Sequence, residues 1–314
     1  MKHHLVFLDR ASLGVDFPRP DFPHDYTEYP ETMTESEVIA RLAPATIVLN
    51  NKVKITEAIL SQLPNLKMIA IAATGSDIID KAACAKRGII VSNIQNYAIN
   101  TVPEHTLALI FALRRNLVTY ANSVRKGRWF EVNQFCYFDY KILDVAGSTL
   151  GIVGYGSLGK SIAKRAEALG LNIIATDTYD FPGRVDLDTL FRQADIITLH
   201  CPLTPENKHM INAKTLGMMK KTAILINTAR GGLVDSQALV AALKSGQIGG
   251  AGIDVLADEP PRPGSDPLLD YTGDNLIVTP HVAWASHQAM TILAQQLSDN
   301  IAAFVAGKPR NIVS

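Results

Sequence analysis

The sequence predicts an α/β protein with two doubly wound parallel sheets. Both halves of the chain alternate short apolar runs with amphipathic segments, the pattern of strands joined by crossover helices. The apolar runs of the second half are continuous and rich in β-branched residues, which is typical of strands that helices cover on both faces. A chain of 314 residues also exceeds the usual size of a single hydrophobic core, so we expect about two domains.

In the first half, short strands are expected to alternate with amphipathic helices. The segment Leu13–Pro30 interrupts this pattern with four prolines, and we expect it to be an irregular excursion. The expected strands are Leu5–Asp9, Thr46–Asn50, Met68–Ala73 and Ile89–Ser92, and the expected helices are Thr34–Leu42, Thr56–Leu63 and Ile79–Lys86, the last ending before Gly88.

A buried helix is expected to begin near Pro103. Proline is tolerated in a first helical turn, and the helix dipole favours the acid Glu104 at that end. The apolar run Leu107–Leu113 is too long for a one-sided surface stripe, so the helix should lie in a domain junction or a subunit interface. We expect the segments that follow, Arg128–Phe130 and Phe135–Tyr140, to form a loop that covers another part of the protein.

A second series of apolar runs begins after Ser148 and predicts the second sheet. The last helical pattern, Gln288–Val305, need not belong to this series and can return to pack on the first half. The expected strands are Leu150–Gly154, Asn172–Asp177, Asp195–Cys201, Ala223–Thr228, Gly252–Val255 and Leu276–Thr279.

The composition excludes several classes of function. Lys+Arg and Asp+Glu both number 30, so no net charge attracts nucleic acid or an anionic membrane. No run approaches the ~20 apolar residues of a membrane helix. The cysteines Cys84, Cys136 and Cys201 are scattered, which favours reduced thiols in the cytoplasm over disulfides or a metal site. We therefore expect a cytoplasmic protein with no metal, nucleic-acid or membrane partner.

The sharpest local motif is a GxGxxG turn formed by Gly154, Gly156 and Gly159. It follows an apolar run and opens a helical pattern over Ser157–Ala168 that closes at Gly170. In a dinucleotide-binding turn, the first glycine allows the tight turn, the second lets the backbone approach a pyrophosphate, and the third lets helix and strand pack. The free N–H groups of the helix start then face the phosphates. The alternative is a tight strand–helix turn without a ligand.

An acid at the end of the next expected strand extends this motif. Asp177 lies 18 residues beyond Gly159, where a carboxylate can accept hydrogen bonds from the ribose hydroxyls and repel a 2′-phosphate. This favours NAD over NADP. Arg184 lies downstream and could weaken this preference for NAD. The alternative interpretation is that Asp177 is a solvated residue at a strand end with no role in cofactor binding.

Three later segments place polar residues where strands are expected to end, the edge at which open α/β sheets bind ligands. The guanidinium of Arg230 matches a substrate carboxylate in a bidentate way. His281 suits proton transfer near neutral pH, because the unperturbed pKa of histidine is ~6.5. A carboxylate beside the other ring nitrogen would orient the ring, and spacing alone leaves Asp258 and Glu259 open for that role. Each residue alone also fits a surface or structural role, and only their joint placement favours a site.

These motifs together resemble the D-isomer-specific 2-hydroxyacid dehydrogenases, and within them the glycerate dehydrogenase/hydroxypyruvate reductase group. The resemblance runs in family order from about residue 50 to 290. It is carried by Ala73–Asp80, Val102–Thr106, the glycine turn, Asn227–Gly231, Asp254–Pro260 and Thr279–His281.

The resemblance implies a role for each matching residue. It assigns substrate binding to Arg230, the histidine partner to Glu259 rather than Asp258, and acid/base chemistry to His281. It implies that the backbone N–H groups of Gly75 and Ser76 hold the substrate carboxylate, with Asn51 and Trp284 also at the substrate. The implied cofactor contacts are Thr106, Gly154, Gly156, Ser157, Leu158, Gly159, Asp177, Cys201, Pro202, Thr228, Ala229, Asp254 and His281.

The resemblance also implies the architecture and the assembly. A Rossmann NAD-binding domain, residues 99–287, is inserted into a flavodoxin-like substrate-binding domain, residues 1–98 and 288–314. Dimers form through the cofactor domains in this family, which suits the buried helix expected from Pro103.

The expected reaction is the NADH-dependent reduction of hydroxypyruvate or glyoxylate. The large indole of Trp284 near His281 should narrow the pocket and favour such short substrates. Two alternatives stay open: another 2-keto acid, phosphorylated or bulkier, and an NAD-sensing corepressor of transcription, which can retain the same residues.

Overall fold

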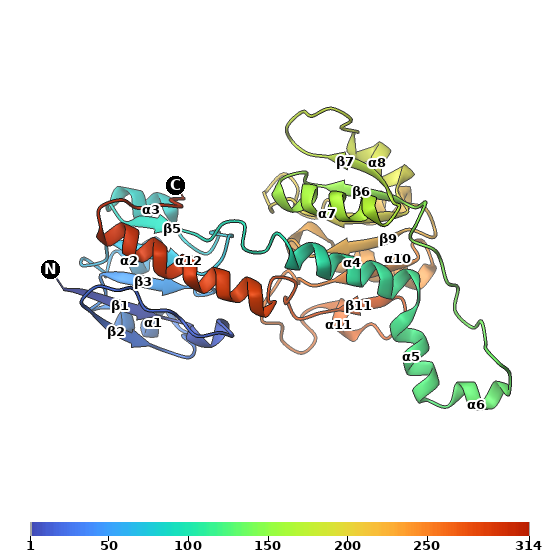
Figure 1. Ribbon diagram of the computed structural model, residues 1–314, viewed down its shortest axis with the longest axis horizontal. Helices are drawn as coiled ribbons and strands as arrows, with labels where there is room; N and C mark the ends of the chain where they lie inside the picture. Colours follow the sequence, from blue (N-terminus) through green and yellow to red (C-terminus); the bar gives the residue numbers. More distant parts are fainter. Residues whose placement is uncertain (1, 314) are drawn as a thin grey trace. The chain divides into compact units, whose positions relative to one another are not determined.

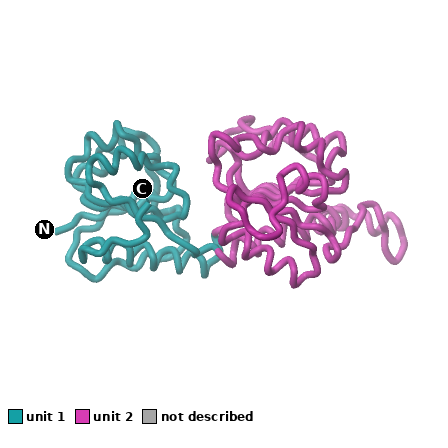
Figure 2. Tube along the Cα trace, turned by 90° about the horizontal axis from the view of Figure 1, so that it is seen from above, with its two compact units in different colours: residues 1–98, 285–314 teal, residues 99–284 magenta. Residues whose placement is uncertain are grey.

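Two parallel sheets organise the computed structural model, which describes residues 2–313 (Figure 1). The chain folds into two compact units. The first unit consists of residues 1–98 and 285–314, and the second unit of residues 99–284 (Figure 2). Both units are α/β, as the sequence predicts.

The first unit contains a five-stranded parallel sheet in the order β2-β1-β3-β4-β5. This is the flavodoxin-like order 2-1-3-4-5, in which the strand order reverses at β1, so that β2 and β3 lie on opposite sides of it. Helix α12 packs against β4 of this unit, so the last helix does return to the first half. The strands are β1 His3–Phe7, β2 His24–Glu28, β3 Ile47–Asn50, β4 Met68–Ile71 and β5 Ile90–Ser92, and the helices are η1 Arg10–Ser12, α1 Glu35–Leu42, α2 Glu57–Leu60, α3 Lys81–Lys86 and α12 His287–Val305.

The expectation that Leu13–Pro30 is wholly irregular is wrong, because it contains β2. This strand pairs in parallel with β1, from His3↔His24 to Phe7↔Glu28, and lies at the edge of the sheet. Its sequence is polar and no residue in it is fully buried. An edge strand with one partner needs no apolar run, so hydrophobic patterning could not reveal it.

The helices of the first unit begin where side chains satisfy free backbone N–H groups. Thr34 accepts from the backbone N–H of Glu37, and the Glu37 carboxylate accepts from that of Thr34, which completes a capping box. Thr56 caps α2 and Asp80 caps α3 in the same manner.

The second unit contains a six-stranded sheet in the order β11-β10-β9-β8-β6-β7, and every pair is parallel. A single parallel bridge joins Ala175 of β7 to Arg184. Counting it as a rudimentary strand, the sheet begins with the order 3-2-1-4-5-6 of dinucleotide-binding domains. The strands are β6 Thr149–Val153, β7 Asn172–Thr176, β8 Ile196–Leu199, β9 Ile224–Asn227, β10 Gly250–Ile253 and β11 Leu276–Val278.

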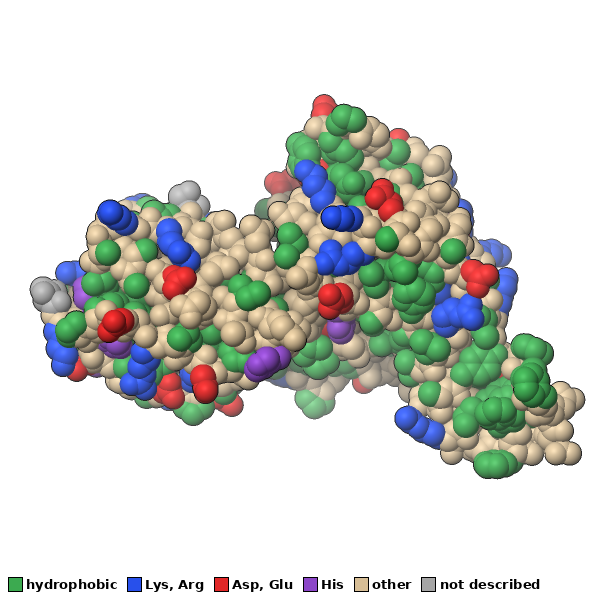
Figure 3. All heavy atoms as spheres, in the orientation of Figure 1, with side chains coloured by type: hydrophobic (Ala, Val, Ile, Leu, Met, Phe, Trp, Pro, Cys, Tyr) green, Lys and Arg blue, Asp and Glu red, His purple; other side chains and the backbone are tan. Residues whose placement is uncertain are grey.

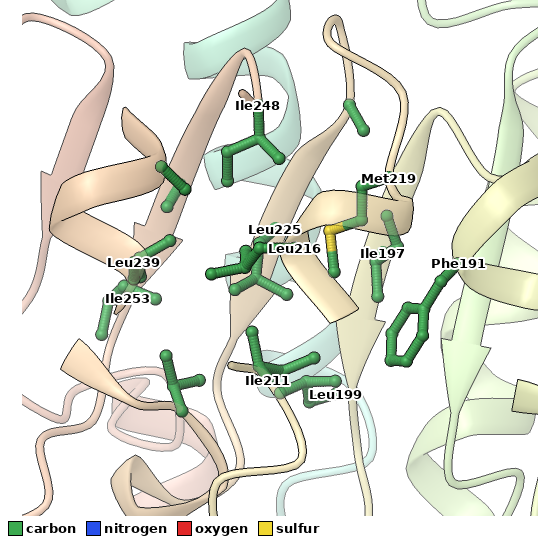
Figure 4. Packing of buried hydrophobic residues seen from close by; sticks show 14 of the residues in the cluster. Phe191, Ile197, Leu199, Ile211, Leu216, Met219, Leu225, Leu239, Ile248 and Ile253 are labelled. Atoms are coloured by element: carbon green, nitrogen blue, oxygen red, sulfur yellow. The ribbon is translucent and has the colours of Figure 1, made fainter. Parts of the chain in front are cut away.

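Helices cover both faces of this second sheet. On one face α4 and α7 pack on buried residues such as Leu150, Ile152 and Ile226. On the other face α8, α9 and α10 close a core around Phe191, Leu225 and their neighbours (Figure 4). The helices are α4 Thr101–Arg114, α5 Leu117–Arg125, α6 Arg128–Val132, α7 Ser157–Ala168, α8 Leu187–Gln193, α9 Ala213–Met218, η2 Gly231–Leu233, α10 Ser236–Ser245 and α11 Pro267–Asp270.

The segment after residue 100 differs from the expectation in two ways. The helix begins at Thr101 and ends at Arg114, and Asn116, with φ 51°, separates it from α5. The expected loop from Arg128 is partly wrong, because Arg128–Val132 forms the short helix α6 after Gly127, whose φ is 89°. Both breaks depend on left-handed backbone positions, which asparagine and glycine adopt most readily.

Candidate active site

The glycine turn joins β6 to α7 and shows why each glycine is needed. Gly154 has φ +96°, and a Cβ there would lie 2.5 Å from the backbone N of Cys201. A Cβ on Gly159 would collide with the carbonyl O of Gly154, whereas nothing lies within 4 Å of a Cβ placed on Gly156. The turn is therefore closed on the protein side and open at Gly156, which fits the approach of a pyrophosphate.

The start of α7 offers backbone donors to such an anion. Gly156 occupies the N-cap and supplies no side-chain hydrogen bond to the first turn. The N–H groups that follow, at Ser157 and Leu158, are in the part of a helix that has no intrahelical partner. They carry the positive end of the helix dipole, so the residues present fit a dinucleotide phosphate.

Asp177 lies directly after β7 and beside the glycine turn. Its Oδ2 accepts a hydrogen bond from the backbone N of Tyr155 at 2.5 Å, and its Oδ1 accepts from the N–H of Thr178 at 2.7 Å. Arg184, the cation that could soften the preference for NAD, forms an ion pair with Asp180 at 2.5 Å. A carboxylate at this position suits free ribose hydroxyls and disfavours a 2′-phosphate.

The loop that carries Arg230 follows β9 and is shaped by a buried asparagine. The Oδ1 of Asn227 accepts from the N–H of Ala229 at 3.0 Å, and its Nδ2 donates to the carbonyl O of Arg230 at 2.9 Å. Asn227 is 0% exposed. Arg230 itself has extended backbone, with φ −144° and ψ 135°, and its Nη1 donates to the O of Ala229 at 2.7 Å.

Glu259 and His281 form a hydrogen-bonded pair between the segments that follow β10 and β11. The Oε2 of Glu259 lies 2.6 Å from Nδ1 of His281, and its Oε1 accepts from the backbone N of Leu256 at 2.8 Å. The side chains are 30% and 26% exposed, respectively. The carboxylate holds the ring by one nitrogen, which leaves Nε2 as the nitrogen that can exchange a proton with a substrate.

Arg230, Glu259 and His281 thus follow β9, β10 and β11, which are neighbouring strands. The carboxyl ends of parallel strands meet at one edge of a sheet, so all three residues share the edge of the glycine turn. Spacing left Asp258 and Glu259 open as the histidine partner, and the geometry places Glu259 at that position.

The other expected cofactor residues of the second unit lie on this edge or on α4. The hydroxyls of Thr106 and Thr228 are 3.3 Å apart. The backbone of Cys201, which precedes Pro202, packs against Gly154. Burial raises the pKa of the Cys201 thiol to about 11, so the thiol is protonated at neutral pH. Trp284 donates its indole N–H to the carbonyl O of His281 at 2.9 Å.

The expected substrate residues of the first unit follow β3 and β4 at the carboxyl edge of that sheet. The backbone N of Asn51 donates to both oxygens of Asp9, at 3.0 and 3.1 Å, and its Nδ2 donates to Ser12 at 3.0 Å. Gly75 and Ser76 lie in the partly exposed turn after β4. The sequence pattern did not single out Asp9 as a residue that holds Asn51. An acid at the end of the first buried strand is the signal that could have identified it.

Between residues 2 and 313, no helix is long and apolar enough to cross a membrane. Over the same range, no cluster of three or more His, Cys, Asp or Glu side chains could hold a metal ion.

A doubly wound sheet with this glycine turn, an acid directly after the next strand and a carboxylate–histidine pair is the arrangement of a dinucleotide-dependent oxidoreductase. Comparison with known proteins agrees. The family model "D-isomer specific 2-hydroxyacid dehydrogenase, NAD binding domain" matches residues 107–283. The chain therefore belongs to the D-isomer-specific 2-hydroxyacid dehydrogenase family, and its cofactor is NAD.

Individual relatives support the same family. Over 313 residues the chain is 60% identical to the glycerate dehydrogenase of Methylorubrum extorquens, covering 100% of this chain and 99% of that protein. It is 35% identical over 285 residues to the hydroxypyruvate reductase of Blautia hydrogenotrophica, covering 88% of each. The D-lactate dehydrogenase of Aquifex aeolicus, solved with NAD and lactic acid, is similar with a TM-score of 0.81 at 29% identity, covering 97% of this chain and 96% of that one.

Proposed function

We propose that this enzyme reduces hydroxypyruvate or glyoxylate with NADH, as a glycerate dehydrogenase/hydroxypyruvate reductase. The 60% identity to a glycerate dehydrogenase along nearly the whole chain supports this substrate class. The observation that carries the proposal is the 2.6 Å pair of Glu259 and His281 on the edge that also bears the glycine turn.

In the proposed reaction, His281 moves the proton. Bound NADH supplies the hydride. As the carbonyl carbon is reduced, its oxygen takes a proton from Nε2 of His281, and the same nitrogen acts as the base in the reverse direction. Glu259 holds Nδ1 at 2.6 Å and stabilises the imidazolium electrostatically. The guanidinium of Arg230 binds the substrate carboxylate and polarises the carbonyl.

The remaining roles follow the family resemblance. We propose that the first unit is the substrate-binding domain and that the N–H groups of Gly75 and Ser76, with Asn51, bind the substrate carboxylate. Trp284 narrows the pocket for a short 2-keto acid. The proposed NAD contacts in the second unit are Thr106, Gly154, Gly156, Ser157, Leu158, Gly159, Asp177, Cys201, Pro202, Thr228, Ala229, Asp254 and His281.

The proposed acid/base role is tested with His281→Gln. This variant should retain NADH binding while kcat falls by ~10²-fold or more, a typical contribution of general acid catalysis. Stopped-flow or steady-state oxidation of NADH measures kcat, and fluorescence titration measures NADH binding. His287→Gln is the matched control, because His287 is an exposed histidine of the first unit. Near-normal turnover of His281→Gln across pH would refute the role.

A panel of 2-keto acids tests the substrate class. We expect hydroxypyruvate and glyoxylate to give the highest kcat/KM, above pyruvate, a phosphorylated hydroxypyruvate and branched 2-keto acids. A preference for the phosphorylated or bulkier acids would replace the proposed substrate within the same family. If no 2-keto acid were reduced while NADH still bound, an NAD-sensing corepressor would become the better reading.

We also propose that the enzyme is a homodimer. The aromatic arm, residues 128–140, carries Phe130, Phe135 and Phe138, which are 88%, 93% and 82% exposed. Figure 3 shows hydrophobic side chains gathered over this part of the second unit. Exposed apolar clusters of this kind mark association surfaces, and the family resemblance implies dimers through the cofactor domain. We therefore propose that a second copy of this chain binds to the aromatic arm.

Sedimentation velocity tests the dimer. Changing Phe130, Phe135 and Phe138 together to serine should convert the dimer to a monomer. Met33→Ser is the control, because Met33 is a 73% exposed apolar residue of the first unit. A monomeric parent protein would contradict the proposal.

We further propose a cytoplasmic location, since Cys84, Cys136 and Cys201 are free thiols, which suits a reducing compartment.

A further inference from the structure

Asp254, at the end of β10, holds the loop that carries His281. Its Oδ1 accepts from the backbone N of Val282 at 3.0 Å and from the hydroxyl of Thr279 at 2.5 Å, and its Oδ2 accepts from the backbone N of Ala283 at 2.9 Å. Its own carbonyl O accepts from the N–H of His281 at 2.7 Å. One buried residue therefore binds the backbone of His281 and of the two residues after it, and the side chain of Thr279 before it.

Helix α4 contacts the same loop at two points. Near its start, the hydroxyl of Thr101 donates to the carbonyl O of Ala283 at 3.0 Å. One helical turn later, Nε2 of His105 lies 3.1 Å from the hydroxyl oxygen of Thr279 and 3.6 Å from Oδ1 of Asp254. Residues four apart share one face of a helix. This face of α4 therefore forms hydrogen bonds to the loop both before and after His281.

The donor and acceptor in each of these bonds can be deduced from proton counting. A hydroxyl has one proton, and an ionised carboxylate only accepts. The proton of Thr279 is used in its bond to Asp254, so its oxygen must accept in the contact with His105. His105 therefore donates its Nε2–H to Oγ1 of Thr279, and Thr279 donates its hydroxyl proton to Oδ1 of Asp254.

These hydrogen bonds satisfy the buried carboxylate of Asp254 and hold the backbone conformation of His281. The Asp254 side chain is 0% exposed, and a buried carboxylate is costly unless donors surround it. His281 has φ 54°, a left-handed backbone that a non-glycine residue keeps only when its surroundings impose it. The bonds to Asp254 impose it, and they thereby direct the His281 ring toward Glu259.

We propose that His105 is a positioning residue for His281 and acts through Thr279 and Asp254. The inference rests on the proposed acid/base role of His281. When the Nε2–H of His105 is removed, the Thr279 hydroxyl oxygen no longer accepts a hydrogen bond. Nothing then orients this hydroxyl so that its proton points to Asp254. The loop of His281 then loosens, and proton transfer to the substrate slows while the cofactor-binding turn is untouched.

A pair of variants at Thr279 tests this without a large change in volume. Thr279→Val keeps the shape and removes the hydroxyl, whereas Thr279→Ser keeps the hydroxyl. We expect kcat of the valine variant to fall about 10-fold, equivalent to about 1.4 kcal/mol in the barrier, with the serine variant within about 3-fold of the parent, or roughly 0.7 kcal/mol. In both variants kcat should change more than the NADH dissociation constant does, because the glycine turn is far from the altered hydroxyl in the chain while Asp254 and His281 are also proposed NAD contacts.

The same comparison is made at His105. His105→Leu removes the donor, and His105→Gln can return an N–H near the position of Nε2, so glutamine should restore most of kcat. The solvent deuterium isotope effect on kcat should rise in His105→Leu, because a misplaced His281 makes proton transfer limit the rate. A merely structural histidine would alter stability without changing that isotope effect.

The outcomes separate this inference from the proposed function. If His281→Gln retains turnover, the acid/base assignment fails first. If His281→Gln is inactive while Thr279→Val and His105→Leu keep full kcat, only the positioning role is overturned. It is also overturned if the serine and glutamine variants lose as much kcat as the valine and leucine variants. Should a leucine variant fail to fold, the threonine pair decides alone.

Discussion

Gly231 offers the most demanding test of the geometry around the proposed catalytic residues. It follows Arg230 directly, and a Cβ added to Gly231 would collide with the carbonyl group of Leu256 and the backbone N of Ala257. These obstacles are backbone atoms, so no side chain can swing away. Leu256 also donates its N–H to Glu259 at 2.8 Å, so Gly231→Ala should displace the carboxylate that holds His281.

The expected magnitude follows from these contacts. Overpacking a close-packed site costs about 1–3 kcal/mol, and a collision with backbone belongs in the upper half of that range. Part of this loss is offset, by about 0.4–1 kcal/mol, because alanine restricts the unfolded chain. A net loss of about 2 kcal/mol lowers the melting temperature of a domain of this size by about 4–8 °C. A displacement of about 1 Å at a catalytic group can reduce turnover up to ~10²-fold.

Thermal unfolding followed by circular dichroism measures the first effect, and NADH oxidation with hydroxypyruvate measures the second. The matched control is Gly217→Ala in α9, where no atom lies within 4 Å of the added Cβ. Alanine in that helix should stabilise the protein by about 0.5–1 kcal/mol. If Gly231→Ala melted and turned over like the parent, the close approach of Gly231 to the Leu256 backbone would be refuted.

Two further predictions address the cofactor and the pH dependence of stability. Asp177→Ala should narrow the preference for NADH over NADPH in kcat/KM, because it removes the charge that repels a 2′-phosphate, and an unchanged ratio would contradict the assignment. Burial lowers the pKa of His200 to about 4 from 6.5, so the unfolded chain binds a proton before the folded protein does. His200 should therefore cost the fold stability as pH falls from about 6.5 to about 4, by up to about 3 kcal/mol, with no further loss below that. Urea unfolding of His200→Asn at pH 7 and pH 4.5 should show a smaller pH dependence than the parent, and an equal loss in both proteins would exclude this source.

Much of the second unit could be predicted because its signals are local. The strand positions follow from continuous apolar runs, and α7 spans Ser157–Ala168 as its periodicity and the closing Gly170 predict. The glycine turn is also readable, because its φ values and close approaches depend on residues adjacent in the chain. Such features need no knowledge of which strands become neighbours.

Features that depend on distant partners could not be read from the chain. β2 is polar and exists because β1 offers it one paired edge. The break at Asn116 and the helix α6 depend on left-handed residues whose positions a periodicity search does not reveal. No local pattern singles out His105, which follows the expected helix start at Pro103 and Glu104, yet its Nε2 lies 3.1 Å from the hydroxyl oxygen of Thr279.

The two-sheet α/β class, the glycine turn and the residue types that the chemistry requires could all be predicted from the amino-acid sequence. The folded structure was needed to show that the Glu259 carboxylate lies against Nδ1 of His281, and that Asp254 and one face of α4 hold the loop between β11 and α12. The physical reason is distance along the chain. Backbone conformation and burial patterns arise over a few residues, whereas hydrogen bonds between side chains far apart in sequence require the register of β9, β10 and β11 to be set first.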